Sequence, residues 1–180
     1  MNVQLIVACD QRGVIGTREG GLPWDLPVDK AHFRRQSAGR WMLFGRATFE
    51  EMHGWFTNQR ALVLSGATNY QPAAPGIHVR SISDALAVAR EANAPGLLVA
   101  GGARVFAATL PLADQLIVTH VDVDWQSEHQ DSPLARGDLP RFPKIDPRRW
   151  RLLRRVDHPA DDDHPWPLAI CWYQRGSHGL

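Results

Sequence analysis

The sequence has only two cysteines in 180 residues, and it contains neither a long apolar run nor an excess of charge of one sign. Two cysteines cannot form a disulfide framework. Cys9 and Cys171 both lie in apolar stretches typical of strands, so we expect buried free thiols. No further ligands flank them at the spacing of a zinc site. No apolar run is long enough to span a membrane, and residues 1–13 lack a basic leader and a small-residue cleavage site, so we expect a cytoplasmic protein.

The charge balance argues against another class of partner. Lys and Arg number 20, Asp and Glu number 19, and the formal net charge is +1. Without a bulk positive field the chain has little to hold a polyphosphate backbone, so nucleic acid is not an expected partner. Hydrophobic residues make up 44% of the chain, which is typical of a globular protein. We expect one domain at residues 1–175 and a disordered tail at 176–180.

Apolar runs rich in Val, Ile and Leu alternate with helical patterns, which predicts an α/β fold with a mostly parallel sheet. Strands are expected at 3–9, 41–45, 61–65, 77–79, 96–100, 115–123, 150–156 and 168–174. The last two are expected to form an antiparallel hairpin or edge. Helices are expected at 28–37, within 47–53, from an N-cap at Ser83 to a stop at Pro95, and within 102–110.

Glycine-bearing junctions follow several of the apolar strands, at residues 13–21, 44–48 and 100–106. Ligands of open α/β sheets bind outside the carboxyl ends of strands, where helix N-termini present unpaired N–H groups. Two such junctions together would grip a dinucleotide, with Gly101 and Gly102 against the pyrophosphate and Arg46 and Arg104 pairing with further phosphate charge. Taken singly, each junction is better explained as a tight turn, because none matches a dinucleotide fingerprint or a P-loop.

One carboxylate, Asp29, follows the apolar stretch LPWDLP at residues 22–27. Phe33 lies four residues later on the same helix face, so the carboxylate and the ring would face one cavity. Burial of a carboxylate is costly and raises its pKa. Asp29 would then bind a cationic or amidine-like ligand, or help to move a proton. The alternative is an aspartate favoured only by the helix macrodipole, and residue type and spacing do not decide between these readings.

A series of motifs follows one another in a specific order. They are LIVACDQRGVIG at 5–16, LPWDLPVDKAHFRR at 22–35, MLFGRATFEEM at 42–52, LVLS at 62–65, LLVAGGARVFAATLPLADQLIVTHV at 97–121, and GDLPRFP at 137–143 before two closing strands. Together they resemble the dihydrofolate reductase family over nearly the full length of the chain. The most specific parts are LPW with a carboxylate five residues after the tryptophan, GRxTFE and GGARVF.

The resemblance implies a mostly parallel eight-stranded sheet with an antiparallel C-terminal strand, flanked by four helices. It implies reduction of 7,8-dihydrofolate to tetrahydrofolate by hydride transfer from NADPH with protonation of N5, in support of one-carbon metabolism and thymidylate synthesis. Asp29 would be the single acidic residue that binds the pterin and favours its protonation. Trp24 would hold a water beside it, Thr119 would hydrogen-bond the carboxylate, and Leu22 would cap the nicotinamide from a glycine-rich lid.

The resemblance also implies sets of binding residues. The pterin and benzoyl groups would contact Ile6, Ala8, Phe33, Met52 and Phe56. The nicotinamide end of the cofactor would contact Ala8, Ile15, Gly16, Gly20 and Leu22. The phosphates and adenosine would contact Gly45, Arg46, Ala47, Thr48, Leu64, Ser65, Gly66, Arg80, Ala100, Gly101, Gly102, Ala103, Arg104, Val105 and Phe106. Antifolate inhibitors are expected ligands, and a monomer is the default.

The sequence departs from the family pattern where the substrate's glutamate tail would bind. In the family an apolar residue is usual at the position of Lys30. The Lys30 side chain would either pack its stem against the protein with the ammonium in water, or reach the glutamate tail. An ungapped match places Gln59 at the family's tail arginine. We expect Arg60, one position later, to bind the tail after a one-residue shift.

A second departure concerns the cofactor's 2'-phosphate. Ala47 and Gly66 stand where relatives often carry basic or hydroxyl side chains. Positive charge would come instead from Arg46, Arg104 and Arg80, and NADPH remains the expected cofactor.

Two polar segments remain. Residues 124–136 are interpreted as an inserted, solvated loop beside the lid. The run DHPADDDH at 157–164 is interpreted as a charged hairpin tip rather than a metal site, so no metal is expected. The alternative functions are a reductase of the same fold acting on another pterin or on a ribosylaminopyrimidine, and a nicotinamide-nucleotide-binding module without catalysis.

Overall fold

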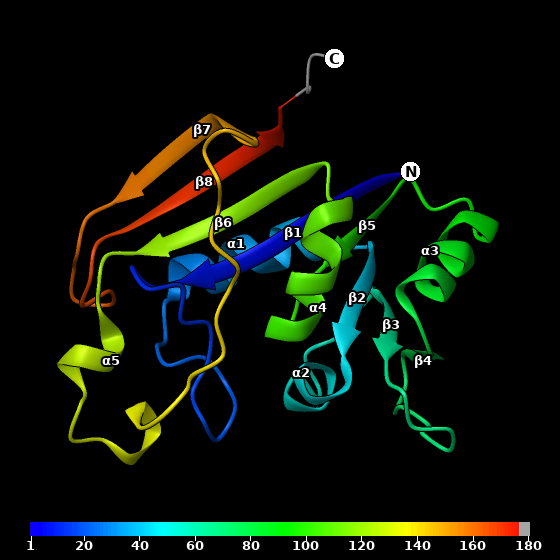
Figure 1. Ribbon diagram of the computed structural model, residues 1–180, viewed down its shortest axis with the longest axis horizontal. Helices are drawn as coiled ribbons and strands as arrows, with labels where there is room; N and C mark the ends of the chain where they lie inside the picture. Colours follow the sequence, from blue (N-terminus) through cyan, green and yellow to red (C-terminus); the bar gives the residue numbers. More distant parts are fainter. Residues whose placement is uncertain (177–180) are drawn as a thin grey trace.

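The computed structural model describes residues 1–176, which form one eight-stranded sheet in the order β4-β3-β2-β5-β1-β6-β8-β7 (Figure 1). The strands are β1 Asn2–Cys9, β2 Trp41–Gly45, β3 Arg60–Leu64, β4 Gly76–Val79, β5 Gly96–Val99, β6 Gln115–Val121, β7 Trp150–His158 and β8 Leu168–Arg175. The strands from β4 to β6 pair in parallel, and β8 runs antiparallel between β6 and β7. The predicted mostly parallel sheet with an antiparallel C-terminal strand is confirmed.

The helices correct the predicted count of four. The described residues contain α1 Pro27–Ser37, α2 Arg46–Glu51, α3 Ile82–Glu91, α4 Ala103–Thr109 and α5 Trp125–Glu128. The additional helix, α5, is a single turn that begins at Asp124, whose side chain accepts a hydrogen bond from the Ser127 amide. Trp125 is only 4% exposed, so this part of the segment predicted as a solvated loop packs into the core. The polar composition of residues 124–136 did not indicate that Trp125 is buried.

The N-cap of α3 is Ser81 rather than the predicted Ser83. The Ser81 hydroxyl accepts from the Asp84 amide at 3.0 Å, and its backbone is extended. Ser83 is the second residue of α3, so it lies inside the helix rather than at its N-cap. Two serines of the same propensity stand two residues apart, so only the backbone conformation distinguishes the cap.

Side chains of the sheet alternate between two packed faces. On β1, Leu5 and Val7 belong to the layer that packs against α3 and α4, whereas Ile6 and Ala8 belong to the layer that includes residues of α1, α2 and α5. Figure 1 shows α4 in front of the sheet and α1 behind it. Both faces of β1 are therefore buried, which explains its continuous apolar sequence.

Both cysteines are free and buried, as predicted. Burial raises the pKa of Cys9 to about 12. No helix within residues 1–176 has the length and apolar character needed to cross a membrane. Of the expected tail, Gly176 is held by a hydrogen bond from its amide to the Arg149 carbonyl, and residues 177–180 lie outside the described part of the chain.

Candidate active site

A cleft of about 1050 Å³ lies between the loop that follows β1, the helices α1 and α2, and the junction that follows β5. Parallel strands bring their carboxyl ends to one edge of a sheet, which is where ligands of such sheets bind. The cleft brings together most of the predicted site. Its wall includes Ile6, Ala8, Ile15, Gly16, Gly20, Leu22, Trp24, Asp29, Lys30, Phe33, Ala47, Thr48, Met52, Ala100, Gly101, Gly102, Ala103 and Phe106.

Asp29 lies in the first turn of α1 and is 9% exposed. Thr119 lies on β6, and its hydroxyl donates to Asp29 Oδ1 at 2.6 Å. Burial raises the pKa of Asp29 above its ordinary value of 3.8, and the bond from Thr119 opposes part of that rise. Phe33, one turn later on α1, faces the same cleft, as the spacing predicted. The macrodipole explanation alone does not account for a buried, specifically bonded carboxylate.

Trp24 and Leu22 reach the cleft from the loop between β1 and α1. The Trp24 side chain is 7% exposed, and its indole N–H has no hydrogen-bond partner within residues 1–176. A buried donor without a partner is costly, so this group is suited to a ligand or a water. Leu22 is 47% exposed at the lip of the cleft.

The two glycine junctions after β2 and β5 lie against each other. The Gly45 amide donates to the Gly101 carbonyl at 2.7 Å. Gly101 has a positive φ of 118°, and a Cβ added to Gly102 would lie 3.0 Å from the Thr48 hydroxyl oxygen. A side chain at Gly101 would be strained and one at Gly102 would crowd Thr48, so the backbone between β5 and α4 is open to the cleft at these two glycines.

Several predicted cofactor residues do not line the cleft: Gly45, Arg46, Leu64, Ser65, Gly66, Arg80, Arg104 and Val105. Arg46 instead lies with its guanidinium 5.5 Å from the centre of the Tyr70 ring and its Nε 3.7 Å from Glu50 Oε1. The Val105 side chain is buried in the core.

Arg60, the residue predicted to bind the glutamate tail, lies away from the cleft. Its guanidinium stacks over the Trp41 ring at 5.5 Å, and Trp41 packs in the layer opposite to that of Ile6. The neighbouring Gln59 is buried and accepts from the Thr57 and Asn58 amides. Alternation along β3 decides this outcome, because a shift of one residue moves a side chain to the other face of the sheet.

Two cations on α1 do reach the cleft wall. Lys30 and Arg34 lie one turn apart on the same side of the helix, and both line the cleft. The Lys30 ammonium is 2.8 Å from Asp25 Oδ1, and both side chains are more than half exposed. Sequence reasoning missed Arg34, although its four-residue spacing from Lys30 was a usable signal.

The glycine-rich lid, residues 14–24, contacts two segments that were not predicted from the sequence to belong to the site. Glu51, at the end of α2, accepts from the Gly21 amide at 3.1 Å. The Ile15 amide donates to the Pro140 carbonyl at 2.9 Å, and Asp138 and Pro140 also line the cleft. These contacts come from residues 138–140, which follow the segment 124–136 that was expected beside the lid.

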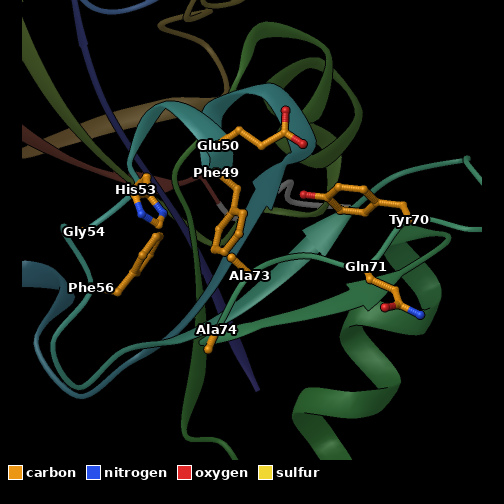
Figure 2. Close-up of a pocket in the computed structure, with 9 residues that line it drawn as sticks. All are labelled: Phe49, Glu50, His53, Gly54, Phe56, Tyr70, Gln71, Ala73 and Ala74. Carbon is orange, nitrogen blue, oxygen red and sulfur yellow. The ribbon is translucent and has the colours of Figure 1, made fainter.

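A second, smaller cavity of about 250 Å³ lies beside α2 and the connection between β3 and β4 (Figure 2). Phe56, predicted at the benzoyl ring, lines this cavity instead of the cleft, and packs on Phe49 with ring centres 5.1 Å apart. Figure 2 shows the Tyr70 hydroxyl directed toward α2. His53 lines both cavities.

The acidic run at 157–164 is part of the β7–β8 hairpin. Asp157 pairs with Arg155 at 2.7 Å, and Asp161 pairs with His164 at 2.6 Å. Within residues 1–176 no three His, Cys, Asp or Glu side chains are grouped in a way that would hold a metal ion.

The fold and the cleft agree with three comparisons. The sequence model of the family described as dihydrofolate reductase matches residues 2–175. Dihydrofolate reductase type 3 of Salmonella typhimurium is 31% identical over 175 residues, which cover 97% of this chain and 99% of the relative. Dihydrofolate reductase of Mycobacterium tuberculosis is 35% identical over 133 residues, 72% of this chain and 78% of the relative. The structure of dihydrofolate reductase from Enterococcus faecalis, complexed with NADP(H) and RAB-propyl, matches with a TM-score of 0.80 and 28% identity, covering 98% of this chain and 97% of the other. The chain belongs to the dihydrofolate reductase family.

Proposed function

We propose that the protein reduces 7,8-dihydrofolate to 5,6,7,8-tetrahydrofolate with NADPH as the hydride donor, and so supports one-carbon metabolism and thymidylate synthesis. The observation that carries the proposal is the buried Asp29, bonded to Thr119, in a cleft that is also lined by Thr48, Gly101 and Gly102. Family membership and the NADP(H) complex of the Enterococcus relative support it.

The cleft fits a nicotinamide dinucleotide. Gly101, Gly102 and Thr48 would hold the pyrophosphate, because all three line the cleft beside the start of α4 and the glycines allow a ligand to approach the backbone closely. Ile15, Gly16 and Ala8 would contact the nicotinamide. When bound, NADPH supplies the hydride, so the protein needs to supply only binding, orientation and proton handling.

Asp29 would bind and orient the pterin. Its two oxygens accept from the exocyclic amino group and N3–H of the ring, and Thr119 fixes the rotation of the carboxylate by bonding Oδ1. The negative charge of Asp29 stabilises a protonated substrate, and the indole N–H of Trp24 is placed to hold the water that carries the proton to N5. Antifolates with an amidine-like edge would pair with the same carboxylate.

Lys30 and Arg34 are proposed to bind the glutamate tail in place of a strand arginine. Both lie on the outer part of the cleft wall, whereas Arg60 stacks on Trp41 and Gln59 is engaged by backbone amides. Arg34 suits this role best, because the Lys30 ammonium already pairs with Asp25.

The test of the reaction is the initial rate of NADPH oxidation with dihydrofolate, compared with NADH and with a tailless 7,8-dihydropterin. We expect saturable turnover that favours NADPH and dihydrofolate. Asp29→Asn is expected to lower kcat/KM by a factor of about 100 or more while NADPH binding survives, since the removed charge acts on the protonated substrate. Turnover of the tailless pterin alone would instead support the alternative of another pterin substrate, which the position of Arg60 favours.

The test of tail binding is Arg34→Ala, with the exposed neighbour Arg35→Ala as the matched control. We expect Arg34→Ala to raise the KM for dihydrofolate about 3- to 10-fold, the effect of losing one partly solvated charged hydrogen bond. The KM for the tailless pterin should not change. Equal effects of the two substitutions, or an equal effect on both substrates, would refute the assignment.

A further inference from the structure

The turn between β7 and β8 contacts the start of α1, the helix that carries Asp29. His164 in this turn is 8% exposed. Its backbone forms a closed pair with Asp161, with N–O distances of 2.9 and 3.1 Å. Two further bonds hold the hairpin in place: the Trp166 indole donates to Glu128 of α5 at 3.1 Å, and the Asp122 amide donates to the Pro167 carbonyl at 2.8 Å. The His164 ring is thus carried on a well-anchored segment.

The first turn of α1 has no cap of its own. Leu26 stands at the N-cap and offers no side-chain acceptor, and Pro27 has no N–H. Val28 therefore supplies the first free amide of the helix, and this amide donates to His164 Nε2 at 3.1 Å. An imidazole nitrogen from 136 residues away takes the place that a serine or aspartate normally fills.

Asp161 determines which ring nitrogen accepts. Its Oδ1 lies 2.6 Å from His164 Nδ1, so Nδ1 carries the proton and Nε2 is left with a free lone pair. The same bond lowers the pKa of the Asp161 carboxyl. Two consecutive hydrogen bonds therefore link Asp161 through His164 to the Val28 amide, one residue before Asp29.

We propose that His164 is a positioning residue for the reaction: by accepting the Val28 amide it fixes the first turn of α1, and so the placement of Asp29 against the pterin and Thr119. The inference rests on the proposed role of Asp29. It assigns a function to the acidic hairpin tip and to the segment that anchors it, neither of which touches the cleft. A displacement of a reacting group by a fraction of an ångström is enough to slow an enzyme.

The test compares His164→Ala, which removes the acceptor, with His164→Gln, whose amide oxygen replaces Nε2. Asp162→Ala is the control, since this exposed side chain in the same turn makes no hydrogen bond in residues 1–176. We expect His164→Ala to lower kcat/KM for dihydrofolate about tenfold, in the range known for lost supporting hydrogen bonds. NADPH affinity should stay within about twofold, because its proposed wall is built from other elements. His164→Gln should recover most of the loss.

Two readouts separate this proposal from the proposed function. Exchange of the Val28 amide proton should be faster in His164→Ala and normal in His164→Gln, and the affinity for a 2,4-diaminopteridine should fall in parallel with activity. A wild-type protein that binds the diaminopteridine but does not reduce dihydrofolate would count against the proposed reaction and leave the His164 test intact. Unchanged diaminopteridine affinity in His164→Ala, or an equal loss of NADPH binding, would overturn the positioning role.

Discussion

At the residue scale, the burial of Asp29 affects both the stability of the fold and the proposed reaction. The folded protein buries this carboxyl and raises its pKa, so the folded state binds its proton more tightly than the unfolded state does. The resulting stabilisation is complete below pH 3.8 and is lost as the pH rises through the raised pKa. At neutral pH the ionised group destabilises the fold, and the proposed function gives this anion its role opposite the pterin.

Asp29→Asn is therefore expected to raise the melting temperature at pH 7. The amide keeps an oxygen for the Thr119 hydroxyl and removes the buried charge. We expect an increase of about 2–4 °C, which corresponds to roughly 1 kcal/mol for a chain of this length. The difference from the wild type should shrink as the pH is lowered toward 3.8. Calorimetry across this range is the measurement, and a less stable Asn variant at pH 7 would show that hydrogen bonding outweighs desolvation at this site.

Residues near the cleft differ in how well the sequence predicted them. Asp29, Phe33 and Thr119 lie on regular elements whose periodicity sets the direction of the side chain, and the structure brings them together. Phe56 lies in the irregular connection between α2 and β3, and Arg60 is the first residue of β3 after it, so one residue more or less in this connection reverses the face on which Arg60 lies. The spacing of residues therefore predicted well that Asp29 and Phe33 face one cleft, and predicted poorly which cations line it.

At the element scale, the lid is held by α2. Glu51 accepts from the Gly21 amide, and a Cβ at Gly20 would lie 2.6 Å from Glu51 Oε1. The positive φ angles of Gly20 and Gly21, 98° and 71°, allow the chain to approach this carboxylate closely. The bond links the lid to α2, whose first turn carries Thr48, a residue that lines the cleft and is proposed to bind the cofactor.

Replacement of Glu51 by Ala should loosen the lid. An exposed hydrogen bond to a charged group contributes about 0.5–1 kcal/mol, so we expect the dissociation constant of NADPH to rise about 2- to 5-fold. Hydrogen exchange at the Gly21 amide should become faster. Glu51→Gln keeps an acceptor and serves as the control. If Ala and Gln behave alike at Gly21 and in NADPH binding, the Glu51 contact does not hold the lid.

The short helix α5 contains a buried residue, Trp125, whose burial the sequence did not predict. The polar segment 124–136 contains two large apolar residues, Trp125 and Leu134, and both pack against a cluster formed mostly by other parts of the chain. The Trp125 amide donates to Asp10 Oδ2 at 3.2 Å, and the Arg12 guanidinium pairs with Asp124 at 2.7 Å. The polar composition of such a segment indicates that most of its residues are exposed. The burial of Trp125 is seen only together with the residues that it contacts.

At the scale of the whole molecule, parallel topology assembles the site from distant segments. Asp29 and Thr119 are 90 residues apart, and Val28 and His164 are 136 apart. The strand order places β1 between β5 and β6, so that the lid, the glycine junction after β5 and the end of β6 meet at one edge. The cleft is a consequence of this order, since every strand that feeds it ends on the same side.

The sequence by itself determined most of the elements, the sheet class, the presence of Asp29 and Phe33 on one helix face and the family, because hydrophobic periodicity and short motifs are local properties that persist along the chain. Only the tertiary structure decided that Arg60 leaves the cleft and Arg34 lines it, that Trp125 is buried, and that His164 caps α1. These outcomes depend on which side chains meet across the sheet. Such meetings are set by strand register and by the paths of irregular connections, and neither is encoded in the spacing of residues within one segment.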